Sequence, residues 1–258
     1  MNKKLTVIKV GGKIVEDKAT LNALLDDFAK IEGKKVLVHG GGRSATKIAE
    51  KLGIETKMVD GRRITDDAML EVVTMVYGGL VNKNIVAGLQ ARGINALGVT
   101  GADLNLILSD KRKVVTTDYG WVGDVKAAND SELANLVNRN IVPVFAPLTH
   151  DGKGNMLNTN ADTIAAETAK AAAKHFDVTL IYCFEKEGVL ADENDDNSVI
   201  PNINESRYAE LKAAGIVAGG MIPKLDNAFS TIKSGVSQVH ITKATNIADS
   251  SKGTVISL

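Results

Sequence analysis

The sequence predicts an α/β fold in which a largely parallel sheet is covered by helices on both faces. Short, continuous apolar runs rich in β-branched residues alternate along the chain with segments of helical period. Strands that are apolar on both faces are typical of parallel sheets buried between helices. The chain has 258 residues, 44% of them hydrophobic, which is enough to bury a large core as one domain or as two lobes.

The apolar runs predict strands at residues 5–10, 35–38, 96–99, 141–145, 178–183 and 238–242. The helical patterns predict helices at residues 19–31, 44–52, 66–92, 131–138, 161–175, 205–214 and 224–235. Helix starts carry capping residues; for example, Thr65 precedes Asp66 and Asp67, where unpaired backbone N–H groups need acceptors. Between residues 109 and 125 the pattern predicts a β-excursion, a candidate lid, in place of another strand–helix unit.

Charge and composition exclude several functional classes. The chain carries 31 basic and 31 acidic residues, which predicts no general attraction to nucleic acid or to an anionic membrane. Its single cysteine, Cys183, lies in an apolar run and is interpreted as a buried structural thiol. No signal-peptide pattern precedes the first strand, and no apolar run approaches the roughly 20 residues needed to span a bilayer. The expected location is the cytoplasm.

Two glycine turns follow the first two expected strands. Gly11 and Gly12 end the first, and residues 40–42 are three glycines that end the second. Such turns leave backbone N–H groups open to an anion, and a following helix adds its positive end. With Lys9 beside the first turn, the pair predicts a site that grips a phosphoryl group from two sides. The alternative is that both turns only allow tight packing of strand against helix.

Other nucleotide-binding patterns fit less well. The P-loop pattern is absent from the sequence. Residues 40–45 match G-x-G-x-x-A, and Asp60 follows about 20 residues later, as in nicotinamide dinucleotide sites. That pattern normally follows the first strand of its unit, which here already carries its own glycine turn. A nicotinamide-dependent oxidoreductase therefore stays a remote alternative.

Two polar clusters lie in the second half of the chain. Asn158, Asn160 and Asp162 alternate before an alanine-rich helix, and an extended segment would direct them to the same side. A plain helix N-cap is the alternative for either asparagine. Residues 219–224 predict a loop that places Lys224 near a helix N-terminus, where the dipole disfavours a cation. A nearby anion would explain that lysine, and a solvated side chain is the alternative.

Taken in order, these motifs resemble the amino-acid kinase family, and within it the acylglutamate kinases. The resemblance covers essentially the whole chain and rests on IKVGG, HGGG, GRRIT at residues 61–65, LNTNAD at 157–162 and GGMIPK at 219–224. It implies a three-layer αβα sandwich around a largely parallel sheet and ATP-dependent phosphorylation of the γ-carboxylate of an N-acylglutamate in arginine biosynthesis. It further implies a homodimer, an acyl-amino-acid lobe at residues 1–173 and a nucleotide lobe at 174–258, divided near the alanine-rich helix.

The resemblance also implies roles for individual residues. Lys9 and Lys224 would stabilise the transferring phosphoryl group, and Asp162 would hold both ammonium groups in position. The acyl amino acid would be bound by Gly41, Gly42, Arg63, Asn158 and Asn160. The nucleotide would be bound by Gly11, Gly12, Glu185, Lys186, Gly188, Leu190, Ile216 and Met221. Mg²⁺ would be held mainly by the nucleotide phosphates, because no carboxylate cage is visible in the sequence.

This sequence departs from the family pattern at two places. Phe184 and Glu185 stand where relatives carry a hydroxyl residue and an aspartate, and Arg62 stands where many carry an apolar residue. Arg62 is either solvated or meets a second carboxylate on a bulkier acyl group such as succinyl. The sequence shows no N-terminal helical extension of the kind found in arginine-inhibited relatives, so no feedback by arginine is expected. The alternatives are a carbamate, aspartate, glutamate or uridylate kinase, or a non-catalytic amino-acid sensor.

Overall fold

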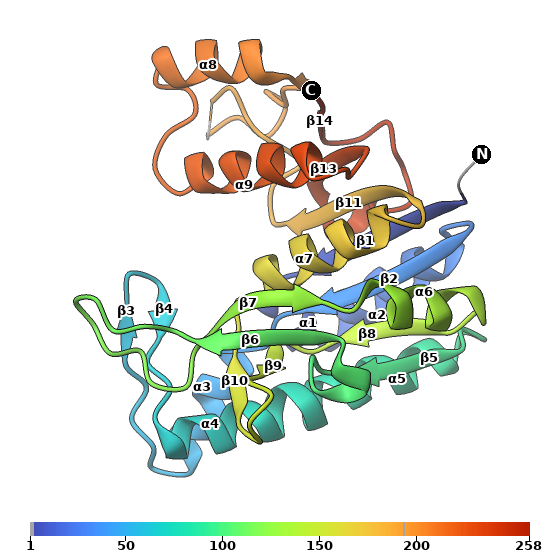
Figure 1. Ribbon diagram of the computed structural model, residues 1–258. Helices are drawn as coiled ribbons and strands as arrows, with labels where there is room; N and C mark the ends of the chain where they lie inside the picture. The colour runs from blue at the N-terminus through green and yellow to red at the C-terminus, as the bar shows by residue number, and fades with distance from the viewer. Residues whose placement is uncertain (1–2, 193) are drawn as a thin grey trace.

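The computed structural model describes residues 3–192 and 194–258, and its core is one eight-stranded sheet (Figure 1). The strand order is β12-β14-β13-β11-β1-β2-β8-β5, and every neighbouring pair is parallel except β13 with β14. The strands are β1 (Lys4–Val10), β2 (Lys34–His39), β5 (Ala96–Val99), β8 (Val142–Phe145), β11 (Asp177–Phe184), β12 (Asn202–Ile203), β13 (Gln238–Lys243) and β14 (Thr254–Ile256). All six strands predicted from the apolar runs are present.

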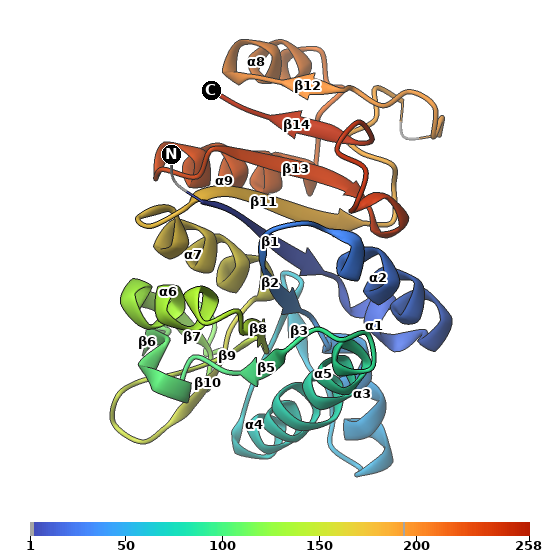
Figure 2. The same cartoon turned by 90° about the vertical axis from the view of Figure 1, so that its right-hand side faces the viewer.

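Helices cover both faces of this sheet (Figure 2). One face is covered by α6 (Asp130–Asn138), α7 (Ala161–Ala173), α8 (Glu205–Ala213) and α9 (Met221–Lys233). The other is covered by α1 (Gly12–Glu16), α2 (Lys18–Lys30), α3 (Gly42–Lys51), α4 (Asp67–Val73) and α5 (Asn82–Gln90). Each layer has its own buried apolar cluster, with Ile164 and Phe229 in the first and Leu24 and Ile85 in the second. The predicted three-layer α/β fold is confirmed.

The predicted long helix at residues 66–92 is interrupted by a π-helix at Thr74–Val81, between α4 and α5. The run Asp67–Gln90 is the one helix in the described ranges that is long and apolar enough to cross a membrane, by length and composition alone. This corrects the expectation that no apolar run approaches that length. The run is apolar because it packs on the sheet beside α2 and α3, and Ile85 and Leu89 on it are fully buried.

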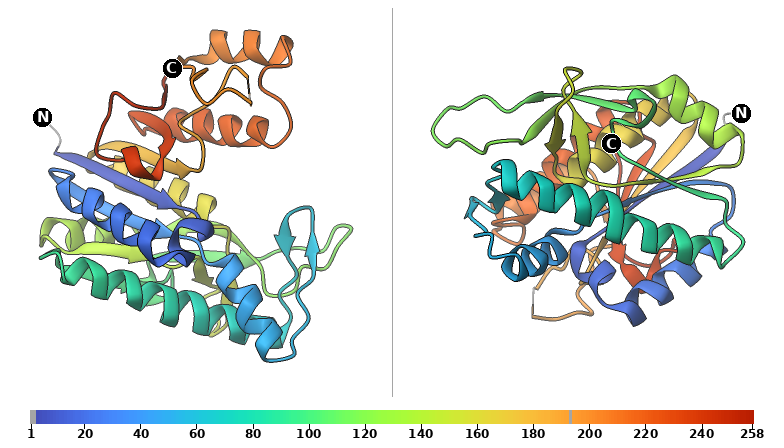
Figure 3. Two further views of the ribbon diagram at one scale, coloured as in Figure 1. Left: turned by 180° about the vertical axis from the view of Figure 1, so that it is seen from behind. Right: turned by 90° about the horizontal axis from the view of Figure 1, so that it is seen from below.

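Two smaller sheets flank one end of the molecule (Figure 3). One has the order β10 (Met156–Asn158), β9 (Leu148–His150), β6 (Ile107–Lys111) and β7 (Gly123–Ala128), and β6 and β7 are the predicted β-excursion. The other is a hairpin of β3 (Met58–Val59) and β4 (Arg62–Arg63). Trp121 N–H donates to Thr65 O at 2.6 Å, and Thr65 N–H donates to Tyr119 O at 2.9 Å, so the excursion is tied to the start of α4. Its role as a lid stays a prediction.

The sheet runs without a break from the first half of the chain into the second. β1 pairs with β11 over its whole length, from Lys4 opposite Asp177 to Val10 opposite Cys183. Because both strands are parallel, their carboxyl ends lie side by side at one edge. The segments that follow β1, β2 and β11 therefore meet at the same place.

Candidate active site

The two glycine turns meet at the carboxyl edge of β1 and β2. Gly40 N–H donates to Val10 O at 2.9 Å, and a Cβ on Gly40 would lie 3.0 Å from the nitrogen of Gly12. A Cβ on Gly41 would lie 2.7 Å from the ring of Tyr77, which the π-helix presses against this turn. A side chain at Gly41 would therefore collide with Tyr77, and one at Gly40 would force the first turn to shift.

Packing does not account for the glycines of the first turn. A Cβ on Gly11 would meet nothing within 4 Å. A Cβ on Gly12 would stand 3.5 Å from the nitrogen of Gly42 and 3.6 Å from that of Gly41, an ordinary van der Waals separation. It would, however, fill the space in front of those two N–H groups. The turns thus form a cradle that is open to an anion, as the donor set of a phosphate site requires.

Two lysines and an aspartate converge beside this cradle. Lys9 is buried, and its Nζ lies 2.8 Å from Oδ1 of Asp162 in the first turn of α7. Lys224 lies on α9 with its Nζ 4.1 Å from the centre of the Phe184 ring. Burial lowers the pKa of Lys224, while Asp162 opposes this shift and Lys9 adds to it. The structure therefore brings together the three residues predicted to act on the phosphoryl group.

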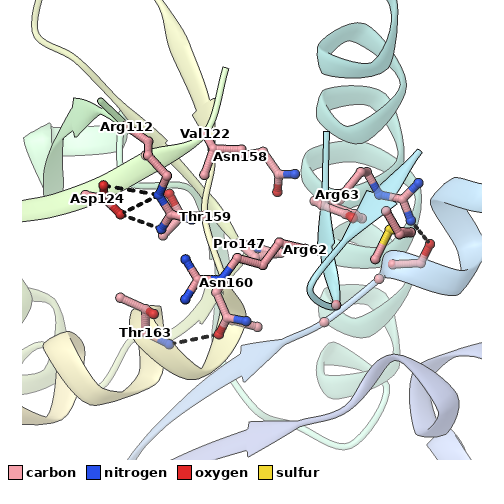
Figure 4. A pocket seen from close by; sticks show the side chains of 18 residues that line it. Arg62, Arg63, Arg112, Val122, Asp124, Pro147, Asn158, Thr159, Asn160 and Thr163 are labelled. Carbon is pink, nitrogen blue, oxygen red and sulfur yellow. Dashed lines mark hydrogen bonds and ion pairs between the residues drawn. The ribbon is translucent and has the colours of Figure 1, made fainter. Parts of the chain in front are cut away.

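A cavity of about 240 Å³ opens between the β3–β4 hairpin, the β-excursion and the start of α7 (Figure 4). Its lining includes every residue predicted to bind the acyl amino acid: Gly41, Gly42, Arg63, Asn158 and Asn160. Asn158 donates to Thr65 Oγ1 at 2.9 Å. These residues come from three separate segments, and the fold assembles them around one space.

The two neighbouring arginines of this cavity point in opposite directions (Figure 4). Arg63 is buried and turns toward α3, where it donates to Gly42 O at 2.8 Å and to Thr46 Oγ1 at 2.9 Å. Arg62 extends toward Asn160, and its side chain has no hydrogen bond or ion pair with any residue in the described ranges. Arg63 is thus largely occupied in holding the hairpin to α3, and Arg62 is the unpaired cation among the described residues that line the cavity.

The polar run before α7 does not face one side as predicted. The extended segment ends at Asn158, and α7 begins at Ala161, so the alternation stops there. Asn160 caps α7 by accepting from Asp162 N–H at 2.8 Å and from Thr163 N–H at 3.2 Å. Asn158 and Asn160 line the cavity, whereas Asp162 turns to Lys9. The capping alternative therefore holds for Asn160, which lines the cavity as well.

The residues predicted to bind the nucleotide fall into two places. A cavity of about 720 Å³ between the end of β11 and the start of α9 is lined by Lys186, Gly188, Leu190, Ile216 and Met221. Glu185 lies instead in a cavity of about 330 Å³ beside Gly11 and Gly12. The loop predicted at residues 219–224 is shorter than expected. Only Gly219 and Gly220 lie outside the helix, because α9 begins at Met221 and already contains Lys224.

Three other residues have structural explanations. His39 is fully buried between Gly40 O and Asn82, and burial lowers its pKa to about 4. Cys183 is buried as predicted, and burial raises the pKa of its thiol to about 12. Asp60, part of the nicotinamide pattern, lies in the turn of the β3–β4 hairpin with φ 49°. Across residues 3–192 and 194–258, no group of three His, Cys, Asp or Glu side chains is placed to hold a metal ion.

Comparison with known proteins identifies the family. A model of the amino acid kinase family matches residues 4–243. The chain belongs to the amino acid kinase family. Acetylglutamate kinase of Bacteroides fragilis is 69% identical to this amino acid kinase over 247 residues, which cover 96% of this chain and 95% of that protein.

Solved structures share the fold of this amino acid kinase. The protein smu.665 from Streptococcus mutans superposes with a TM-score of 0.78 at 29% identity, over 98% of both chains. N-acetylglutamate synthase from Neisseria gonorrhoeae, in complex with coenzyme A and N-acetyl-glutamate, superposes with a TM-score of 0.82 at 19% identity. That match covers 99% of this chain and 59% of the synthase, and it shows the fold.

Two cations at the glycine turns of this amino acid kinase were not predicted from the sequence. Lys13 and Arg43 line the cavity that holds Glu185, and Lys13 Nζ lies 2.6 Å from Glu185 Oε2. A signal was present, since each turn is followed directly by a cation, in GGK at residues 11–13 and GGR at 41–43. The pairing of Lys13 with Glu185 had no signal, because 172 positions separate the two residues.

Proposed function

We propose that this chain transfers the γ-phosphoryl group of ATP to the γ-carboxylate of N-acetyl-L-glutamate, or of a related N-acylglutamate, in arginine biosynthesis. The observation that carries the proposal is the convergence of Lys9, Asp162 and Lys224 on the glycine cradle, next to the cavity of Arg63 and Asn158. The high identity to a curated acetylglutamate kinase over nearly the full chain supports the same substrate. The product is an acyl phosphate, and the enzyme is a phosphotransferase with a carboxyl acceptor.

The reaction needs little proton chemistry. A glutamate γ-carboxylate has a pKa of about 4, so the nucleophile is ionised at neutral pH without a general base. The obstacle is repulsion between that carboxylate and the triphosphate, which Lys9 and Lys224 would offset from two sides. Asp162 keeps the two ammonium groups in position, and the N–H groups of Gly12 and Gly42 would fix the phosphate oxygens. Positioning of oxygen and phosphorus in line supplies the rest of the rate enhancement.

The cradle fits the phosphates of a nucleotide, because its N–H groups face a space that a single Cβ on Gly12 would fill. Mg²⁺ bound to those phosphates would supply further charge neutralisation, and the chain's own contribution is the two lysines. The adenosine would occupy the cavity of Gly188, Leu190, Ile216 and Met221. Residues 1–173 would then form the lobe for the acyl amino acid, and residues 174–258 the lobe for the nucleotide.

The proposal also covers the location, the oligomeric state and the partners of the enzyme. We propose a cytoplasmic homodimer that does not engage nucleic acid or membrane. The balance of basic and acidic residues supports the absence of polyanion binding. The packing of Asp67–Gln90 against the sheet supports its assignment as a core helix.

One observation favours a second acyl group. Arg62 extends into the substrate cavity, and its guanidinium has no partner among the described residues. An acetyl group offers it no charge, whereas a succinyl group carries a carboxylate that an arginine binds bidentately. N-succinylglutamate is therefore the second candidate substrate.

A hydroxamate-trapping assay tests the proposed reaction. The purified chain would be incubated with ATP, Mg²⁺ and hydroxylamine, and with N-acetylglutamate, N-succinylglutamate, glutamate, aspartate or carbamate in turn. Hydroxamate with an N-acylglutamate alone is the expected result. Turnover of another acceptor would assign the chain to a different reaction of the family, and ligand binding without turnover would indicate a sensor. Protection against thermal unfolding by NAD but not by ATP would indicate the oxidoreductase alternative.

A further inference from the structure

The third cavity lies beside the two glycine turns. It has a volume of about 330 Å³, and its lining includes Lys9, Gly12, Lys13, Arg43 and Glu185. Lys13 comes from α1, which follows the first turn, and Arg43 comes from α3, which follows the second. The cavity thus receives one cation from each turn in addition to Lys9.

The three cations of this cavity differ in how their charge is balanced. Lys9 is buried against Asp162, while Lys13 is paired with Glu185 at 2.6 Å. The Arg43 side chain has no hydrogen bond or ion pair within the part of the chain that the structure describes, and its positive charge lowers the pKa of Glu185, as the charge of Lys13 does. One carboxylate therefore faces two exposed cations in a space that adjoins the phosphate cradle.

The contact of Lys13 with Glu185 is easily opened. The side chains are 55% and 58% exposed, and ion pairs exposed to this degree contribute little to stability because water screens them. A triphosphate carries several negative charges, so it would compete effectively with a single carboxylate for Lys13. It would also repel Glu185 and favour a conformation in which that side chain has left the cavity.

We propose that Lys13 and Arg43 bind the β- and γ-phosphates of the nucleotide, and that Glu185 occupies their site until the nucleotide displaces it. Before the nucleotide binds, the Glu185 carboxylate thus takes the place of a phosphate and holds the Lys13 side chain at the cavity. This inference rests on the proposed nucleotide site and adds two phosphate-binding residues and a competing carboxylate to it.

The test compares the affinity for a non-hydrolysable β,γ-bridged ATP analogue with that for AMP. Any contact of Glu185 with the ribose affects both ligands and cancels in the ratio of their dissociation constants. Lys13→Gln and Arg43→Gln should each reduce the preference for the ATP analogue about tenfold, as expected for losing one solvent-screened, charge-assisted hydrogen bond. Glu185→Gln should increase that preference several-fold, because it removes the competing anion.

Lys47→Gln is the matched control. Lys47 is itself exposed, and its ion pair at 2.7 Å joins α3 to Glu16 of α1, but it does not line the cavity. This variant should leave the preference unchanged. An unchanged preference in Lys13→Gln, or a shift of Glu185→Gln in the same direction as Lys13→Gln, would overturn the proposal. Failure of the native chain to bind the ATP analogue at all would instead contradict the proposed function.

Discussion

Lys9 and Asp162 form an ion pair that joins the end of β1 to the first turn of α7, with 2.8 Å between Nζ and Oδ1. Asp162 also attracts Lys224, whose ammonium group Lys9 repels. The carboxylate therefore lets two like charges remain close to one another before the substrates bind. In the proposed reaction, this positive charge would lie where negative charge gathers during phosphoryl transfer.

Lys9→Ala and Lys224→Ala should each lower turnover far more than they weaken binding of the acylglutamate. In the proposed mechanism both charges act on the phosphoryl group during its transfer, so the loss should be about 10²- to 10³-fold in kcat. Steady-state kinetics with the acylglutamate varied at saturating ATP measures it. Lys233→Ala, at the far end of α9, is the control and should behave as the native chain. Near-normal turnover in either test variant would remove that lysine from the mechanism.

Gly12→Ala should abolish most activity without unfolding the protein. The new Cβ would keep ordinary distances of 3.5 and 3.6 Å to the nitrogens of Gly42 and Gly41, but it would fill the cradle in front of them. Gly79→Ala, in the π-helix and outside the cradle, is the matched control, since its Cβ would meet nothing within 4 Å. Thermal unfolding and kcat should separate the two: both variants fold, and only Gly12→Ala is inactive. Equal activity of the two would argue against a phosphate in the cradle.

Arg63→Ala should weaken both substrate binding and the fold. If Arg63 binds the substrate α-carboxylate throughout the reaction, its loss should raise the KM for the acylglutamate and leave kcat nearly unchanged. The loss also removes the hydrogen bonds from Arg63 to Gly42 O and Thr46 Oγ1, which still pair with each other, at a cost of about 1–3 kcal/mol in the free energy of unfolding. Thr56→Ala, which removes only the 3.2 Å contact to Arg63 Nη1, should have a small effect on both. A pure turnover defect in Arg63→Ala would contradict its assignment to the substrate.

Arg62→Leu should shift the substrate preference toward the acetyl compound. A partly desolvated guanidinium–carboxylate pair contributes about 1.5–3 kcal/mol, which corresponds to roughly tenfold to a hundredfold in catalytic efficiency. The measurement is kcat/KM for N-acetylglutamate and N-succinylglutamate in both proteins. If Arg62 is only solvated, the ratio of the two efficiencies will be the same before and after the substitution.

His39 should make the stability of the fold depend on pH in the mildly acidic range. Its pKa is about 4 in the folded chain and about 6.5 in an unfolded one. Between these values the unfolded chain binds the proton and the folded chain does not, so the stability contribution present above pH 6.5 is lost as pH falls toward 4. The expected loss is ~3 kcal/mol.

Denaturant unfolding of the native chain and of His39→Gln over this pH range measures the effect. The pKa of buried His240 is also lowered, so His240 and the carboxylates also make stability depend on pH. They do so in both proteins, so the difference between the two curves of stability against pH isolates the effect of His39. Direct titration of the His39 ring by NMR provides a second measurement if the variant does not fold. A midpoint near 6.5 would show that the ring is not held neutral by burial.

The sequence predicted those strands and helices that are long enough to show a regular spacing of apolar residues. The six main strands and the helices from α2 to α9 follow from apolar runs and helical spacing, within a few residues at each end. The strands β12 and β14 and the helix α1 are only two to five residues long, which is too short for a period to show. The π-helix keeps the apolar composition of its neighbours, so nothing in the pattern marks it.

The candidate site was predictable where its residues adjoin a recognisable turn. Lys9, Gly12 and Asp162 stand next to strand ends, and parallel strands bring such ends together. The orientation of Arg62 and Arg63 was not predictable, because a two-residue strand decides which side chain turns inward. The pair of Lys13 with Glu185 depends on the register of β1 against β11, which no local pattern specifies.

The pairing of β1 with β11 also bears on how the two halves of the chain depend on each other. A break in the chain between Ala173 and Asp177 would separate residues 4–10 from the strand that covers their backbone. Each fragment would then carry a bare edge of buried, mostly apolar residues, and such edges recruit other strands. The fragments are therefore expected to reassociate or to aggregate. Evolution could exchange loops around this site more readily than it could exchange either half of the molecule.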